Sequence, residues 1–164
     1  MKPQLLETLY QNYARELLLY LYSLCRNQAM AEDLLQEVFL KALLSLQDTH
    51  PNFRAWLYLV AKNLYLNQAK RHPPAAIPDD SSNPQDNPLE LLLKQERLQL
   101  LFSALFSLSP MQREVITLQY FSGLSQKEIA QLLRLSPGNV RIIAHRAKKE
   151  LKQRLEAQDY GRIL

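Results

Sequence analysis

One stretch of this chain limits its fold more than any other: the proline-rich segment near the middle. Of the nine prolines, five lie between Pro73 and Pro88, among Ser, Asn and Asp residues and few apolar side chains. A segment of this composition cannot bury a core, so residues 72–88 are expected to form an extended, mobile linker. It divides the 164 residues into two parts, 1–71 and 89–164, each of the size of a small domain.

Both parts have the composition of helical proteins, because leucine is abundant and only three glycines are present. The single cysteine, Cys25, excludes an intramolecular disulfide and a cysteine-rich zinc site, and it suits a reducing cytosol. No stretch has the length of a signal peptide or of the roughly 20 apolar residues that cross a membrane. The predicted fold class is all-α, with two small helical domains. The protein is expected in the cytoplasm, without direct insertion into a membrane.

The formal charge changes along the chain. Residues 1–71 carry a net charge of +2, residues 72–89 carry −3, and residues 90–164 carry +5. The C-terminal part is therefore the better partner for a polyanion such as DNA.

Three helices are expected in the first part, because apolar residues recur there at helical spacing. The first contains Leu5 to Leu24, Asn27 caps a second from Gln28 to about Leu46, and Asn52 caps a third from Phe53 to about Arg71. The residues expected to face inward are Leu5, Leu9, Ala14, Leu17, Leu21, Leu24, Ala31, Leu34, Leu35, Val38, Leu43, Leu46, Phe53, Trp56, Leu57, Val60 and Leu64, with Phe39 also in the core.

The second part contains clear signals for the starts of helices. A helix is expected from about Leu89 to Ser107. Ser109 before Pro110, Ser125 three residues before Glu128, and Ser136 before Pro137 then predict helices over 110–121, 126–134 and 137–156. The last two helices are joined by a few residues, which is the layout of a helix-turn-helix.

The last helix separates an apolar face from a basic one. Val140, Ala144, Ala147, Leu151 and Leu155 are expected to pack inward, whereas the Lys, Arg and His side chains lie on other faces. A basic helix face is usually only solvated. Here the helix follows a short turn and begins with small or polar residues, so DNA reading is favoured: its first turn enters the major groove and later cations contact phosphates.

Two separate motifs resemble one known family. The stretch GLSQKEIAQLLRLSPGNVRIIAHRAKKELK, residues 123–152, resembles the fourth conserved region of bacterial sigma factors of the extracytoplasmic-function group. In the first part, AEDLLQEVFLKAL (31–43) and FRAWLYLVAKNLYLNQAKRH (53–72) resemble the family's second region. The resemblance covers about residues 5–155, and two motifs in the right order make it specific.

The resemblance implies binding to core RNA polymerase and to two promoter elements, without a cofactor or metal. The polymerase partners are the clamp of the largest catalytic subunit and the flap of the second subunit. The clamp contact falls on one stripe of the second helix, made of Asp33, Gln36, Glu37 and Leu40. Family members are commonly inhibited by an anti-sigma protein, which would also be able to hold this chain at a membrane.

The resemblance also supplies candidate DNA contacts. For the −10 element they are Asp48, Thr49, His50, Pro51, Asn52, Arg54, Tyr58, Lys62, Asn63, Tyr65, Lys70 and Arg71. For the −35 element they are Ser125, Gln126, Lys127, Ser136, Pro137, Gly138, Asn139, Arg141, Ile142, His145, Arg146, Lys148 and Lys149. For Tyr58 and Tyr65, packing against a neighbouring helix is an equal alternative.

Departures from the family pattern leave alternatives open. Ile143 stands where the family commonly has an arginine used on DNA, so either the −35 preference differs or this part binds DNA weakly. A sigma-like decoy and a stand-alone helix-turn-helix regulator are therefore the competing functions. An enzyme is disfavoured, because no nucleophile–base pair or phosphate-binding glycine loop is present and His50 and His72 lack companion metal ligands.

Overall fold

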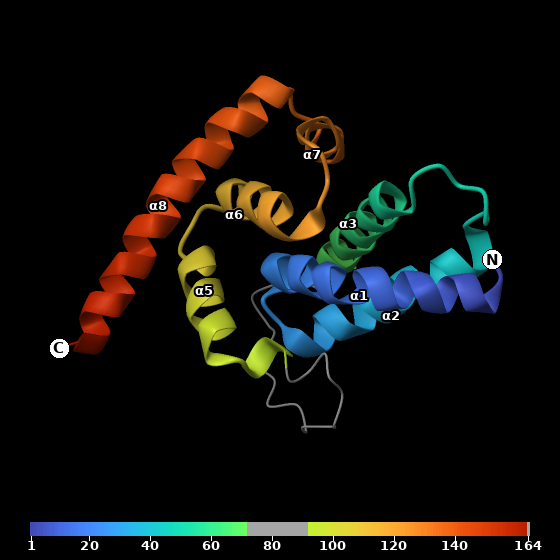
Figure 1. The fold of residues 1–164 in the computed structure, drawn as a ribbon, viewed down its shortest axis with the longest axis horizontal. Coiled ribbons are helices and arrows are strands. Elements are labelled where there is room, and N and C mark those ends of the chain that lie inside the picture. The colour runs from blue at the N-terminus through green and yellow to red at the C-terminus, as the bar shows by residue number, and fades with distance from the viewer. Residues whose placement is uncertain (72–91, 164) are drawn as a thin grey trace. The chain divides into compact units, whose positions relative to one another are not determined.

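The computed structural model describes residues 1–71 and 92–163, with side chains described up to Gln158. Within these ranges every regular element is a helix, so the predicted all-α class is confirmed (Figure 1). The chain divides into two compact units, Met1–Asn83 and Pro84–Leu164, which are called unit 1 and unit 2 below. The predicted linker, residues 72–88, lies outside the described residues.

Unit 1 contains three helices that pack pairwise: α1 (Pro3–Cys25), α2 (Gln28–Ser45) and α3 (Phe53–Arg71). The turn from α1 to α2 passes through Arg26 in the left-handed region, with φ of 52°. Asn27 then caps α2, since its side-chain oxygen accepts a hydrogen bond from the Met30 N–H at 2.9 Å. The predicted cap at Asn27 is therefore confirmed, and it stabilises the start of α2 by about 1 kcal/mol.

The core of unit 1 is built mainly from leucine. Leu17, Leu21, Leu34 and Leu57 are each at most 1% exposed, as expected. The prediction for Leu43 was wrong, because this side chain is 36% exposed. The buried stripe of α2 runs through Ala31, Leu34, Leu35, Val38, Phe39 and Ala42. A helix turns 100° per residue, so Leu43 falls at the edge of that stripe rather than within it.

Five further side chains of unit 1 were expected inside and are only half-buried. Two of them, Leu5 and Leu24, belong to α1, and the other three, Phe53, Trp56 and Val60, lie in the first half of α3. Leu57, Tyr58, Ala61 and Leu64 form the buried side of this helix instead. The buried face of α3 is therefore rotated about the helix axis, so that it includes Tyr58, which the prediction left outside it.

Unit 2 is built around one long helix. Its elements are α5 (Glu96–Phe106), α6 (Pro110–Thr117), a π-helical turn η2 (Leu118–Ser122), α7 (Gln126–Leu133) and α8 (Pro137–Ile163). Helix α8 contacts α5, α6 and α7. The helix expected over 89–107 is interrupted at Gln95, whose backbone is extended, with ψ of 131°, so α5 is shorter than predicted. The helix expected to reach residue 121 changes to π-helical geometry at Leu118.

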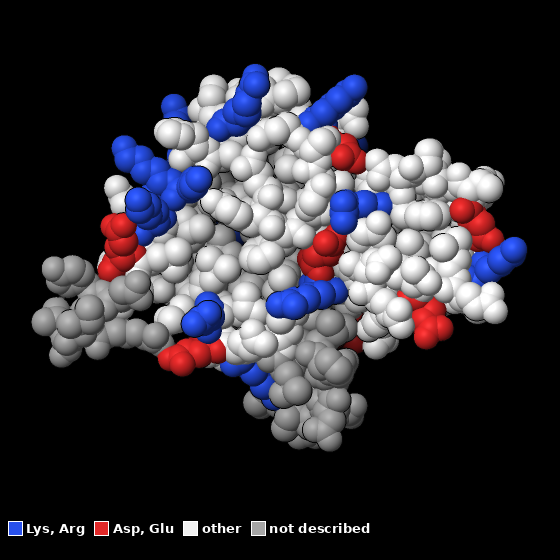
Figure 2. Space-filling model, in the orientation of Figure 1, with Lys and Arg blue, Asp and Glu red and all other residues white. Residues whose placement is uncertain are grey.

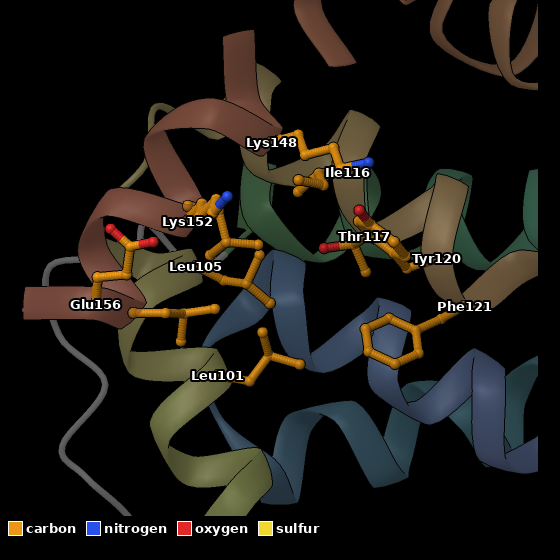
Figure 3. A pocket seen from close by; sticks show the side chains of 11 residues that line it. Leu101, Leu105, Ile116, Thr117, Tyr120, Phe121, Lys148, Lys152 and Glu156 are labelled. Atoms are coloured by element: carbon orange, nitrogen blue, oxygen red, sulfur yellow. The ribbon is translucent and has the colours of Figure 1, made fainter. Parts of the chain in front are cut away.

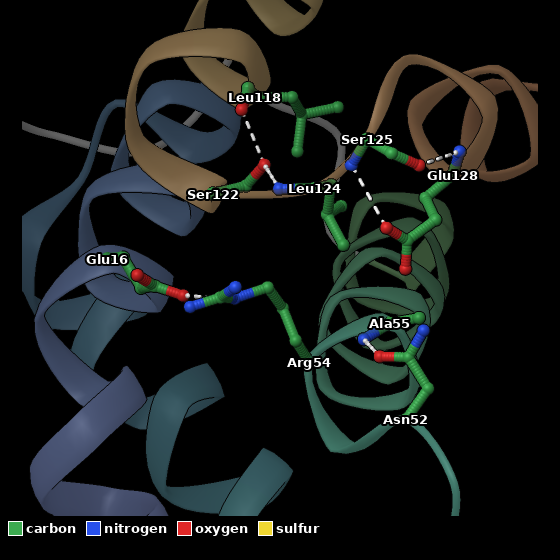
Figure 4. Close-up of polar contacts among 9 residues, drawn as sticks. All are labelled: Glu16, Asn52, Arg54, Ala55, Leu118, Ser122, Leu124, Ser125 and Glu128. Atoms are coloured by element: carbon green, nitrogen blue, oxygen red, sulfur yellow. Dashed lines mark hydrogen bonds and ion pairs between the residues drawn. The ribbon is translucent and has the colours of Figure 1, made fainter.

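The three predicted starts of helices in unit 2 are present. Ser109 Oγ accepts from the Gln112 N–H at 3.3 Å, and Ser136 Oγ accepts from the Asn139 N–H at 3.1 Å. Ser125 forms the full reciprocal cap: its hydroxyl accepts from the Glu128 N–H at 3.1 Å, and the Glu128 carboxylate accepts from the Ser125 N–H at 3.0 Å (Figure 4). These local bonds fix where α6, α7 and α8 begin.

The turn between α7 and α8 completes a helix-turn-helix. Arg134 ends α7 in the left-handed region, with φ of 57°. The Leu135 N–H donates to the Ala130 carbonyl at 2.9 Å and the Arg134 N–H donates to the Gln131 carbonyl at 3.3 Å, which is a Schellman motif. Helix α8 then buries Val140, Ala144, Ala147 and Leu151, as its sequence predicts, whereas Leu155, expected on the same face, is half-buried.

Candidate polymerase and promoter interfaces

The outer face of α2 combines carboxylates with exposed leucines. Asp33, Gln36 and Glu37 are exposed, as the polymerase-contact prediction requires, and Leu40 is 55% exposed. Leu44 is 74% exposed one turn further along the same stripe. Sequence reasoning missed Leu44, although its spacing of four residues from Leu40 places it there. Exposed apolar side chains beside charges are typical of a protein-docking surface.

The segment before α3 is ordered by its own hydrogen bonds. The His50 N–H donates to the Gln47 carbonyl at 3.0 Å, and His50 Nδ1 accepts from the Asn52 N–H at 3.1 Å. Asn52 Oδ1 accepts from the Ala55 N–H at 3.1 Å and so caps α3 as predicted. Of the predicted −10 residues here, His50 is half-buried, whereas Asp48, Thr49, Pro51 and Asn52 are exposed.

On α3, Tyr58 is a correction to the predicted −10 surface. Its side chain has no exposed area, and its ring packs on Tyr20 of α1 with the centroids 5.2 Å apart. Burial, and then the charge of Glu16, raise the pKa of the Tyr58 hydroxyl above its ordinary value. The alternative of packing against a neighbouring helix therefore holds for Tyr58, because a buried ring cannot stack on a base.

Arg54, also predicted to contact DNA, is engaged with α1. Its Nε lies 3.4 Å from Glu16 Oε1 (Figure 4). Its guanidinium also lies over the Tyr13 ring, at 5.1 Å from the centroid. Burial raises the pKa of the Glu16 carboxyl, and Arg54 lowers it by less, so the net shift is upward. Arg54 is thus held within unit 1.

The remaining predicted residues of α3 divide into two sets. Lys62 and Tyr65 are half-buried, whereas Asn63, Lys70 and Arg71 are exposed. The outermost stripe of the helix also carries Leu59 and Leu66, which are 47% and 43% exposed and which the −10 prediction did not include. This face therefore presents amide, cationic and apolar groups together.

The helix-turn-helix exposes almost every residue predicted for the −35 element. The exposed ones are Ser125, Gln126, Lys127, Ser136, Pro137, Asn139, Arg141, Ile142, His145, Arg146, Lys148 and Lys149. Gly138 is half-buried, and Ser136 Oγ lies 4.0 Å from the position that a Cβ on Gly138 would take. Ile143 is half-buried.

Positive charge gathers over the helix-turn-helix of unit 2 (Figure 2). On α8, Glu150 pairs with Arg154 at 3.8 Å. Within the described part of the chain no carboxylate forms an ion pair with Arg141, Arg146, Lys148 or Lys149. Their charge is therefore available to a polyanion.

Unit 2 also contains an apolar cavity of about 500 Å³ (Figure 3). Side chains of α5, α6, η2 and α8 line it: Leu101, Leu105, Ile116, Thr117, Tyr120, Phe121, Lys148, Leu151, Lys152, Leu155 and Glu156. Lys148, Lys152 and Glu156 bring charge to its α8 side. A mostly apolar lining with a few charged groups at one side is typical of ligand-binding cavities.

The described residues contain neither a membrane-spanning helix nor a cluster of metal ligands. No helix there is both long enough and apolar enough to cross a membrane. No group of three or more His, Cys, Asp or Glu side chains is arranged there to hold a metal ion.

The two units correspond to two conserved family regions. Residues 9–73 match the family Sigma-70 region 2, and residues 98–151 match Sigma-70, region 4. The RNA polymerase sigma factor YlaC of Bacillus subtilis is 32% identical over 158 residues, which are 92% of this chain and 91% of YlaC. The chain belongs to the sigma-70 family. The ECF RNA polymerase sigma factor SigL of Mycobacterium tuberculosis is 34% identical over 164 residues, which are 96% of this chain and 91% of SigL.

The family assignment settles the choice of function. A solved structure of the sigma factor RpoE in complex with the anti-sigma factor NepR, from Bartonella quintana, matches with a TM-score of 0.67 and 25% identity. The match covers 85% of this chain and 89% of that one. This chain is an extracytoplasmic-function sigma factor that binds core RNA polymerase and directs promoter-specific initiation. This function is favoured over a decoy or a stand-alone regulator.

Proposed function

We propose that the sigma factor divides its work between its two units. Residues 1–71 bind core polymerase and the −10 element, residues 72–88 connect, and residues 89–164 bind the −35 element. Support comes from the separate hydrophobic cores of the two units and from the match of one sigma region to each. The sigma factor acts in the cytoplasm. It works by binding polymerase and DNA, without catalysis of its own and without a cofactor.

The polymerase clamp docks on α2. The surface consists of Asp33, Gln36, Glu37 and Leu40, and we add Leu44 because it continues the same exposed stripe. The leucines supply apolar area that becomes buried, and the carboxylates at their side select a partner with basic groups.

Melted −10 DNA binds the segment before α3 and the accessible side of that helix as far as its last turn. After Tyr58 and Arg54 are removed, the remaining residues are Asp48, Thr49, His50, Pro51, Asn52, Lys62, Asn63, Tyr65, Lys70 and Arg71. Hydrogen bonds order the segment before α3 in the absence of DNA, and an ordered segment loses less entropy when it binds a strand.

Duplex −35 DNA binds α8 through its major groove. The small and polar first turn, Ser136 to Asn139, approaches base edges, while Arg146 and Lys149 contact phosphates. Ile142 is 51% exposed and suits apolar contact with thymine methyl groups. One observation gives the main support for this assignment. The helix-turn-helix is capped, and within the described residues its basic side chains Arg146 and Lys149 form no ion pair with a carboxylate.

The apolar cavity of unit 2 takes apolar side chains of a protein partner. Candidates are the flap of the second catalytic subunit and an anti-sigma factor, the kind of partner that RpoE has in its complex with NepR. An anti-sigma factor anchored in a membrane would hold this chain there.

The division of labour is tested by run-off transcription with core polymerase from the source organism and a library of genomic fragments. Discrete new start sites give the promoter, and its two elements are then scrambled one at a time. The variant Asn139→Ala/Ile142→Ala, which changes two exposed side chains proposed to face base edges, should lose most of the difference between native and scrambled −35 elements and keep the difference at −10. Loss of discrimination at −10 instead would contradict the assignment.

A further inference from the structure

One ion pair joins α1 to the first turn of α3. Arg54 Nε lies 3.4 Å from Glu16 Oε1, and both atoms are buried although the two side chains are 38% and 20% exposed. The Arg54 guanidinium also lies over the Tyr13 ring, which comes from the turn of α1 preceding Glu16. Arg54 thus has two partners on α1, and its Nε atom is buried between the helices although part of the side chain is exposed.

The rest of the surroundings also favour this inward position. Tyr58, one turn after Arg54, is fully buried and packs on Tyr20 of α1. The ion pair and this aromatic contact therefore join two successive turns of α3 to α1. Moving Arg54 towards a DNA strand would leave the Glu16 oxygen buried without its cation, which costs free energy. The geometry therefore opposes a direct DNA contact by Arg54.

Helix α1 holds the segment before α3 at both of its ends. At one end, the Lys2 N–H at the start of α1 donates to Asp48 Oδ1 at 3.2 Å. At the other end, Glu16 holds Arg54, which is two residues beyond Asn52, the cap of α3. His50 lies between and accepts from the Asn52 N–H at 3.1 Å. The orientation of Asp48 to Asn52 thus depends on α1.

We propose that Glu16 and Arg54 form a positioning pair, which holds the first turn of α3 and the Asp48–Asn52 segment in the orientation that binds the melted −10 strand. This proposal rests on the proposed assignment of that segment to −10 DNA. It gives Arg54 a role through Glu16 instead of a contact with DNA, and it gives α1 a part in promoter binding.

Glu16→Gln is the informative variant, because it keeps the shape of the side chain and removes its charge. Burial raises the pKa of this carboxyl in the folded protein, so folding favours its protonated form and loses that benefit as the pH rises. At neutral pH the amide therefore replaces a carboxylate whose burial is unfavourable, and the melting temperature should not fall. Glu7→Gln, at an exposed position of the same helix, is the matched control.

The test compares wild type, Glu16→Gln, Arg54→Gln and the double variant as holoenzymes, using a labelled single strand that carries the −10 element. Each single variant should bind the strand about tenfold more weakly, and the double variant no more weakly than either, because one interaction is lost in all three. Affinity for core polymerase should not change. A purely structural defect would lower core affinity and the melting temperature as well.

Amide hydrogen exchange tests, in the absence of DNA, whether the Glu16–Arg54 pair stabilises the first turn of α3. The Ala55 amide, which donates to Asn52, should exchange about tenfold faster in Glu16→Gln than in Glu7→Gln. The proposal is overturned if exchange is unchanged, or if Arg54→Gln weakens strand binding while Glu16→Gln does not, since Arg54 would then contact DNA itself. If the wild-type holoenzyme fails to bind the strand, the −10 assignment fails, and the exchange rates alone decide about the pair.

Discussion

Salt dependence of duplex binding provides the sharpest test of the α8 interface. Arg146 and Lys149 are exposed, lie on neighbouring faces of α8 and form no ion pair within the described residues. Each is placed to contact one phosphate and to release one condensed counterion. Replacing both by alanine should therefore weaken binding to every duplex sequence, and weaken it most at low salt.

The expected magnitude follows from counterion release. Each lost phosphate contact reduces the slope of log Kobs against log salt concentration by about 0.9, so the double variant should be shallower by about 1.8. Between roughly 50 and 200 mM salt, that difference changes the ratio of wild-type to variant affinity about twelvefold.

The assay is fluorescence anisotropy with a duplex carrying the −35 element and with a scrambled duplex of the same length. Lys94→Ala/Arg97→Ala is the matched control, since it removes two exposed cations of unit 2 near the start of α5. Its slope should equal that of the wild type. If the α8 variant keeps the wild-type slope, or if the control loses as much, the phosphate contacts on α8 are refuted.

Three further predictions concern other parts of the chain. Ser125→Ala removes the reciprocal cap with Glu128 and should cost about 1 kcal/mol, lowering the unit 2 transition in calorimetry by about 4–8 °C, whereas Ser125→Thr should be close to wild type. Leu40→Glu should weaken core polymerase binding at least about tenfold in a pull-down titration, and equal binding by Leu40→Glu and Leu40→Met would contradict docking on α2. Burial raises the pKa of Cys25 to about 11 from an ordinary 9.0, so iodoacetamide at pH 8 should modify it about 100-fold more slowly than a free thiol, and equal rates would refute that shift.

Capping residues, which act on N–H groups close by in the sequence, predicted the starts of helices well. Asn27, Asn52, Ser109, Ser125 and Ser136 all cap the helices that their positions indicate, because a cap needs only a side-chain oxygen and an N–H two or three residues later. The interruption at Gln95 carried no such signal. Its neighbours Lys94 and Glu96 are good helix formers, and no proline or glycine stands there, so local propensity favours a continuous helix.

Spacing along a helix was less informative about which face is buried. Periodicity shows which residues share a face, and a helix packed against two neighbours buries a wide arc of its surface. Helix α3 packs against both α1 and α2, and its buried arc includes Tyr58 beside Leu57. A tyrosine at the edge of the predicted stripe therefore appeared equally suited to DNA and to the core, and only the packing of three helices decided between them.

Contacts between distant parts of the chain determine what a charged side chain is able to do. Arg54 lies in a motif that resembles a DNA-binding helix, and its charge alone gave no reason to exclude it from the interface. No pattern links Arg54 to Glu16, because the two residues belong to different helices and become neighbours only when α1 packs on α3. Once the pair forms, the positive charge is neutralised within unit 1 and much less of it acts on DNA. The promoter surface of unit 1 is then set by exposed residues of α3 and the preceding segment, while α1 controls their orientation without carrying a recognisable motif for it.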